Sequence, residues 1–267
     1  MRWWFLFFYL TCFSGWVQAT RHFSHFTEKD GLTDNQVQCI LRDQQGFLWV
    51  GTSRGLNRYD GHTFKHFLPD TRQAQRTVSN ENILDIRQDS FGYIWIATAN
   101  GLNRYDPRTE RFKVWKNTGR ADGSLPNSLI WNIFIDQQQQ LWLACDNRDV
   151  CRFNPQTGVF TTYPWKSFLD AVHPKSATTD YKTIYYYRPN GDTGIWFMTN
   201  FGLFSFDFES QAFDYHPYPD QGFPLAKPGG ELNALFFGSW DKDLIRYEPE
   251  KRTWSRIRLP ISSDLTG

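Results

Sequence analysis

Residues 31–60 read GLTDNQVQCILRDQQGFLWVGTSRGLNRYD, and this pattern returns along the chain. Its central run, Phe47–Thr52, recurs at intervals of 46, 47 and 54 residues, centred on Trp95, Trp142 and Trp196. A fifth, weaker copy has Phe236 where the others have tryptophan. Repeats of this period predict a propeller or a helical array. The copies are short β-branched or aromatic runs broken by Gly, Asp, Asn and Pro, which are typical of strands.

Each unit is predicted to hold four strands. In the first unit they cover residues 37–42, 47–52, 56–59 and 63–67. The turns between them contain Asp, Asn, Gly or Pro, which suit tight reversals, so we interpret the recurring acids at these turns as structural. Four antiparallel strands per unit make a propeller blade. The sequence therefore predicts an all-β propeller with about five blades, at residues 31–67, 78–115, 125–163, 180–216 and 230–258.

The two ends of the repeat array predict an incomplete ring. Residues 22–26 copy the outer-strand pattern of residues 63–67, although no inner strands precede them. The fifth unit already has an outer strand of its own at residues 252–257. We therefore expect the front of a longer protein or a truncated reading frame. An open ring would expose unpaired strand edges and a tryptophan-rich flank.

The N-terminus predicts export. Met1–Arg2 precede an apolar run that ends at Phe13, and Val17–Ala19 supply a small-residue cleavage site, the pattern of a secretory signal peptide. The apolar run is shorter than the roughly 20 residues that a membrane-spanning helix needs. We expect residues 1–19 to be removed and residues 20–267 to fold in an oxidising space outside the cytoplasm.

Composition excludes several classes of protein. The net charge of +1 argues against a nucleic-acid binder with a broad basic face. Aromatic residues make up 18% of the chain and charged residues only 21%, which excludes a disordered chain or a coiled coil. So many large rings call for several packed layers.

The first unit closely resembles the two-component regulator propeller repeat. The shared residues are Gly31–Asn35, the Asp43-x-x-Gly46 turn, Leu48–Thr52 and Gly55-Leu56-x-Arg58-Tyr59-Asp60. The second unit is similar to the repeat over residues 78–106, and the resemblance thins toward the fourth and fifth units.

This resemblance implies a non-catalytic, ligand-sensing region in the periplasm. In this family such propellers belong to hybrid histidine kinases or diguanylate cyclases, in which a small β-sandwich, a membrane helix and the catalytic modules lie downstream. Two further blades and these modules would therefore be partners within a longer, inner-membrane receptor. The resemblance also implies a small ligand, with a polysaccharide fragment as the leading candidate. It calls for no cofactor, and it leaves a homodimer open.

A ligand site is expected on the rim that carries the long links between blades, because long loops are often functional. Sugar recognition needs an aromatic platform with planar or charged donors nearby. Six residues are candidates on this rim: Arg54, Asn100, Arg148, Trp165, Tyr181 and Asn200. The alternative is that they are ordinary solvated loop residues.

Three cysteines remain after the predicted cleavage. Cys145 and Cys151 flank a short turn, so a disulfide between them is sterically feasible and suits an oxidising compartment. Cys39 is predicted to be a small buried apolar residue. His22 and His25 would point to opposite faces of a strand, so no metal site is predicted.

Two other classes of function stay open. A secreted propeller enzyme acting on carbohydrates would need paired acids or a base on the loop rim, whereas the acids here repeat in register at turns. A degraded gene fragment or a plain protein-binding scaffold is the other alternative, and a soluble, monodisperse product of this chain would favour the scaffold.

Overall fold

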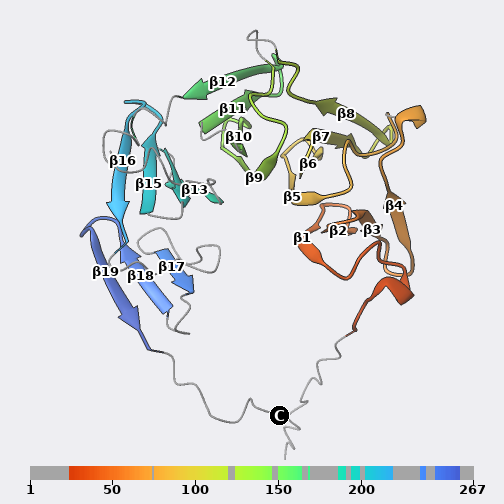
Figure 1. Cartoon of the computed structure of the whole chain (residues 1–267), viewed down its shortest axis with the longest axis horizontal. Coiled ribbons are helices and arrows are strands. Elements are labelled where there is room, and N and C mark those ends of the chain that lie inside the picture. Colours follow the sequence, from red (N-terminus) through yellow and green to blue (C-terminus); the bar gives the residue numbers. More distant parts are fainter. Residues whose placement is uncertain are drawn as a thin grey trace, which may run out of the picture.

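The structure is a computed structural model that describes residues 24–73, 75–119, 124–145, 150–163, 168, 186–190, 194–198, 202–218, 235–238 and 244–258. Within these residues the strands form five antiparallel sheets that follow one another around an open arc (Figure 1). The all-β propeller expected from the repeats is therefore confirmed. In the described part of the chain, no helix has the length and apolar character required to cross a bilayer.

The strands follow the repeats in order. The first blade holds β1 (Val37–Arg42), β2 (Leu48–Thr52), β3 (Gly55–Tyr59) and β4 (Phe64–Phe67). The second holds β5 (Ile83–Gln88), β6 (Ile94–Thr98), β7 (Gly101–Asp106) and β8 (Arg111–Trp115). The third holds β9 (Ile130–Ile135), β10 (Leu141–Cys145), β11 (Val150–Asn154) and β12 (Val159–Tyr163).

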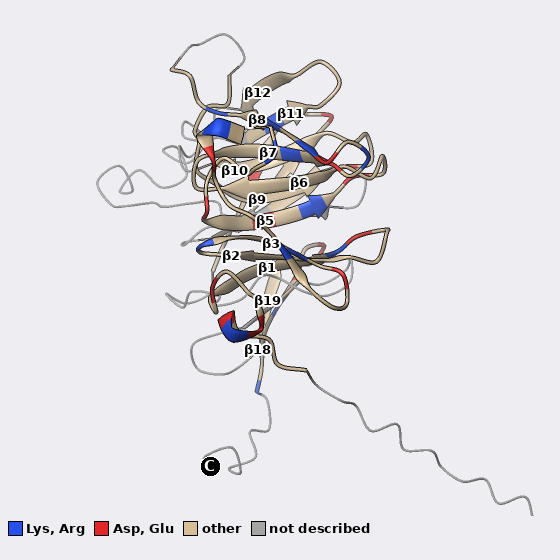
Figure 2. Ribbon diagram, turned by 90° about the vertical axis from the view of Figure 1, so that its right-hand side faces the viewer, with Lys and Arg blue, Asp and Glu red and all other residues tan. Residues whose placement is uncertain are grey.

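The fourth blade holds β13 (Tyr186–Asn190), β14 (Gly194–Met198), β15 (Gly202–Asp207) and β16 (Phe213–Pro217). The described part of the fifth blade is β17 (Leu235–Gly238), β18 (Leu244–Glu248) and β19 (Thr253–Ile257). Two short 3-10 helices, η1 (Glu28–Asp30) and η2 (Thr71–Gln73), lie before β1 and after β4. Along the side of the arc in Figure 2, charged residues of both signs are interspersed at strand ends and turns, in keeping with a net charge near zero.

A buried aspartate closes the turn between the first two strands in each of the first three blades. In the first blade, Asp43 accepts the Trp49 indole N–H at 2.7 Å and the Phe47 backbone N–H at 2.9 Å. The other two blades repeat the contact to the indole with the pairs Asp89–Trp95, at 2.7 Å, and Asp136–Trp142, at 2.8 Å. Both oxygens of each carboxylate accept hydrogen bonds within the blade, which matches the structural interpretation of these acids.

Neighbouring blades meet through groups of three rings, which we call junction triads. In the first triad, Trp49 of β2 and Phe67 of β4 pack against Tyr105 of the next blade, with ring centroids 5.1 to 5.6 Å apart. The same strand positions supply Trp95, Trp115 and Phe153, then Trp142, Tyr163 and Phe206, and finally Trp196, His216 and Tyr247. Because the four tryptophans are at most 5% exposed, the core of the protein lies between the blades as well as within them.

Phe26 occupies the place of an outer-strand ring from a preceding blade. Its ring centroid lies 5.1 Å from that of Tyr59 and 5.7 Å from that of Phe64. Phe67 makes the corresponding contact with Tyr105, at 5.6 Å. This placement agrees with the prediction that residues 22–26 copy an outer strand, although the described residues of that segment form no strand.

Cys39 differs from its prediction, because it is half-buried rather than buried. It lies on the inner strand β1, where it packs against the core shared by the first two blades. A Cβ on Gly51, the residue opposite it in β2, would come within 2.5 Å of the Cys39 sulfur. The glycine therefore makes room for the thiol.

Candidate functional site

A pocket of about 730 Å³ lies on the rim where the first blade meets the second. Its volume falls within the range of small-molecule sites in proteins. The pocket is lined by Thr33, Arg54, His66, Leu68, Pro69, Ser79, Asn80 and Glu81. Arg54, one of the six predicted ligand residues, therefore lies beside the link between these two blades, as the rim assignment expects.

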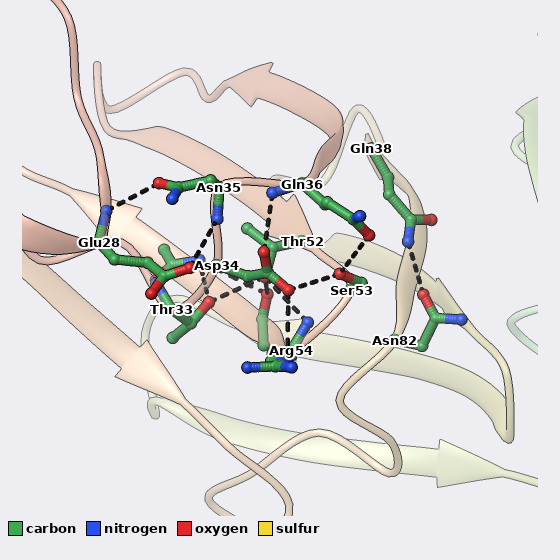
Figure 3. Close-up of polar contacts among 12 residues, drawn as sticks. Glu28, Thr33, Asp34, Asn35, Gln36, Gln38, Thr52, Ser53, Arg54 and Asn82 are labelled. Atoms are coloured by element: carbon green, nitrogen blue, oxygen red, sulfur yellow. Dashed lines mark hydrogen bonds and ion pairs between the residues drawn. The ribbon is translucent and has the colours of Figure 1, made fainter.

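Arg54 projects from the turn between β2 and β3, and 73% of its side chain is exposed. Its Nε lies 3.6 Å from Asp34 Oδ2 (Figure 3). Asp34 also accepts the Ser53 hydroxyl at 2.6 Å and the Gln36 backbone N–H at 2.9 Å. These hydrogen bonds, led by that of Ser53 and aided by the charge of Arg54, lower the pKa of Asp34. The carboxylate thus stays charged and anchored, while the guanidinium beside it remains open to solvent.

Buried polar contacts hold the floor of the pocket. The Thr33 backbone N–H donates to Asn57 Oδ1 at 3.1 Å, and the hydroxyls of Thr33 and Thr52 lie 2.9 Å apart. In the second blade the Ser79 backbone N–H donates to Asn103 Oδ1 at 2.8 Å, and the hydroxyls of Ser79 and Thr98 lie 3.1 Å apart. Asn57, Asn103 and both threonines of the strands are fully buried, so each rim segment is tied to the sheet beneath it.

The third blade replaces this polar network with apolar groups. At the equivalent positions it has Pro126, which lacks an N–H, together with Cys145 and Cys151, which are fully buried in an apolar core. The suggested disulfide is absent, because both cysteines are thiols in the structure. The register pairs Cys151 with Leu143, which leaves Cys145 diagonal to Cys151. Diagonal neighbours are about 7 to 8 Å apart, beyond the usual Cα separation of a disulfide.

Asn100 lies one blade further along the same rim. It is exposed on the turn between β6 and β7, and its backbone N–H donates to Thr98 Oγ1 at 3.1 Å, as that of Arg54 does to Thr52 at 3.2 Å. It does not line the pocket beside Arg54. The other four predicted ligand residues, Arg148, Trp165, Tyr181 and Asn200, lie outside the described residues.

Seven of the eight lining residues were not among the predicted ligand residues, and His66, Asn80 and Glu81 are three of these. His66 Nε2 lies 2.6 Å from the Gly31 carbonyl oxygen, which places the imidazole beside the segment that enters the first blade. Little in the sequence indicated that these residues share a site, because His66 belongs to an outer strand of one blade and Glu81 to the segment that enters the next. Only the packing of two blades brings them together.

Metal-binding groups do not gather in the part of the chain that can be described: no three His, Cys, Asp or Glu side chains there could share an ion. His25 is exposed, and His22, its neighbour in the sequence pattern, lies outside the described residues.

Two segments, residues 31–54 and 77–100, match the family model described as Two component regulator propeller. A stretch of 43 residues is 56% identical to Histidine kinase P4 of Formosa agariphila, which amounts to 16% of this chain and 3% of that protein. The matched stretch is thus a small part of a much longer relative.

Solved structures share the fold. The extracellular domain of a protein described as a hybrid two component system, BT3049 from B. thetaiotaomicron, superposes with a TM-score of 0.73 and 23% identity, over 87% of this chain and 31% of that one. PorZ, a surface component of the type-IX secretion system of Porphyromonas gingivalis, superposes with a TM-score of 0.59 and 15% identity, over 82% of this chain and 33% of that one. The chain therefore spans about a third of each structure. Its fold is that of a β-propeller, and its first two blades each contain a segment that matches the family model of the two component regulator propeller.

Proposed function

We propose that this chain is the ligand-sensing propeller region of a signal-transduction receptor that acts outside the cytoplasm. One observation carries the proposal: the two segments that match the family model supply five of the eight residues that line the pocket. Thr33 and Arg54 belong to residues 31–54, while Ser79, Asn80 and Glu81 belong to residues 77–100. The similarity to extracellular domains of hybrid two component systems supports the same reading.

The ligand of this pocket is a small polar molecule, with an oligosaccharide as the leading candidate. Arg54 is the main recognition group, because its guanidinium is exposed and presents planar donors suited to hydroxyl or carboxylate groups. We propose Asn100, Arg148, Trp165, Tyr181 and Asn200 as the further ligand residues. The rings of Trp165 and Tyr181 supply the aromatic platform of this proposal.

The proposed region is non-catalytic. Glycoside hydrolysis normally uses two carboxyl groups that flank one bond. Among the described lining residues only Glu81 carries a carboxylate, and nearby Asp34 is bound to Ser53, Gln36 and Arg54. The kinase or cyclase output would reside in other modules of the full receptor.

The region works in the periplasm as part of a larger, membrane-anchored protein. A signal peptide at residues 1–19 directs export. Further blades cover the open face of the first blade, where Phe26, Val37 and Ile40 are 39, 46 and 65% exposed. Large apolar side chains gathered at an open edge favour contact with another protein surface.

Calorimetric titration of the purified chain with a panel of neutral, amino and acidic oligosaccharides tests this function. We expect at least one class to bind and Arg54→Ala to weaken that binding about tenfold or more, since hydrogen bonds to charged groups contribute roughly 1.5 to 3 kcal/mol. Arg72→Ala is the matched control, because Arg72 is also exposed and paired with an aspartate, Asp70, yet does not line the pocket. Absence of binding across the panel, or equal losses in both variants, would contradict the proposal.

A further inference from the structure

The fourth junction triad contains a histidine where the other three contain a neutral aromatic ring. His216 pairs with Leu203 across β15 and β16, the position taken by Phe67, Trp115 and Tyr163 in the first three blades. Its ring centroid lies 5.0 Å from that of Trp196 and 5.4 Å from that of Tyr247. The joint between the fourth and fifth blades therefore includes a ring that can gain a positive charge.

The hydrogen bonds of His216 cross this joint. Its Nδ1 lies 2.6 Å from the hydroxyl of Tyr247 on β18, and only 5% of the residue is exposed. The other nitrogen, Nε2, lies 3.5 Å from both Ser205 Oγ and Asp214 Oδ2. A neutral imidazole suits this arrangement, because its unprotonated Nδ1 can accept a hydrogen bond from the Tyr247 hydroxyl.

The charged groups around the imidazole partly cancel. Asp214, on β16, would favour a protonated imidazole, but it also forms an ion pair with Arg252 in the turn between β18 and β19. The Arg252 charge opposes protonation, and Tyr247 is the remaining titratable group that faces the ring from the described residues. Burial outweighs the attraction of Asp214 and lowers the pKa of His216 to about 4.

We propose that His216 makes the joint between the fourth and fifth blades acid-labile, so that acid releases the fifth blade while the first three junctions stay closed. When the fifth blade moves away, water reaches the imidazole and restores its ordinary affinity for protons, near pH 6.5. Protons then favour the released state as the pH falls from about 6.5 toward 4. Over this window the ratio of released to attached molecules rises by roughly two orders of magnitude.

The first three triads cannot respond in this way. Their rings are Trp, Phe and Tyr, which take up no proton in this pH range. Among the four triads, the device is thus confined to the last. It is independent of the ligand pocket, which lies between the first and second blades.

Hydrogen exchange of the full chain between pH 7 and pH 4, with times scaled for the intrinsic pH dependence of exchange, tests this device. We expect protection of β17 to β19 to fall by about 100-fold relative to β5 to β10. His216→Phe installs the ring of the first triad and should abolish this relative loss. His62→Phe, the matched control, changes an exposed histidine at a turn of the first blade, far from the joint, and should retain it.

Two outcomes would overturn the proposal: a fifth blade whose relative protection does not change with pH, or an equal loss in His216→Phe. If that variant fails to fold, the titration of His216 in the wild-type chain, followed by imidazole NMR signals, decides the matter. Titration near pH 6.5 in the attached state contradicts the proposal. Tyr247→Phe should lower fifth-blade protection at pH 7 and keep the acid response.

Discussion

Asp43 accepts the indole N–H of Trp49 at 2.7 Å, in a site where the tryptophan is completely buried. This single contact connects a turn within one blade to the triad that joins it to the next. The Trp49 ring must be buried to join the two blades, and its indole N–H is satisfied by a carboxylate of its own blade. The same relationship in the second and third blades makes it a structural unit of the repeat.

Removal of this carboxylate should be costly. Asp43→Ala leaves the Trp49 indole and the Phe47 backbone N–H without their acceptor, and we expect a loss of about 2 to 4 kcal/mol in the free energy of unfolding. Asp60→Ala is a suitable control, because Asp60 accepts backbone N–H groups at an exposed turn and should cost about 1 kcal/mol or less. Urea denaturation measures both, and equal losses would show that the indole contact contributes little.

The triad tryptophans should dominate the stability of the joints between blades. Trp95 is fully buried against Trp115 of its own blade and Phe153 of the next, so Trp95→Ala should cost about 3 to 5 kcal/mol. Phe91→Ala in the same blade removes a ring that is 64% exposed and should change stability by about 0.5 kcal/mol or less. Denaturant unfolding tests the contrast, which a small effect of Trp95→Ala would contradict.

The rim network should show strong coupling between two positions. Asn57→Cys removes the acceptor of the Thr33 N–H and should destabilise the chain by about 1 to 3 kcal/mol. Thr33→Pro removes that N–H, and the third blade combines Pro126 with Cys151 at these positions. In a double-mutant cycle we expect Thr33→Pro with Asn57→Cys to be more stable than the sum of the single effects. Simple additivity would show that the two replacements are unrelated.

The charge on Asp34 should depend on Ser53. The hydroxyl of Ser53 is the largest cause of the lowered pKa of Asp34, so Ser53→Ala should raise that pKa toward its ordinary value. A carboxyl with a lowered folded-state pKa stabilises the fold above its unfolded pKa, near 3.9, and this contribution disappears as the pH falls through the folded-state pKa. NMR titration of the carboxyl carbon measures the shift. Ser90→Ala, at an exposed turn of the second blade, should leave the Asp34 titration unchanged.

Much of the blade architecture was readable in the sequence. The strands predicted at residues 37–42, 47–52, 56–59 and 63–67 correspond to β1 through β4 within one residue at each end. Local chemistry allowed this, because apolar runs and the Asp and Gly residues of turns lie next to one another in the chain. The placement of Arg54 on the rim followed from the same strand count.

Residues that meet across a joint were harder to predict. The disulfide between Cys145 and Cys151 was wrong, because closeness in sequence says nothing about the diagonal register of two strands. Cys39 was expected to be buried and is half-buried, because β1 is an edge strand of its sheet. His66 and Glu81 line one pocket only because two separate blades pack side by side.

The sequence by itself determined that this protein is a row of similar four-stranded sheets, because a pattern that returns about every 46 residues specifies the same local strands and turns each time. Only the tertiary structure decided which rings form each junction triad and where the pocket lies. Those contacts join side chains from different repeats, and their partners are selected by how one blade packs against the next rather than by any pattern within a single repeat.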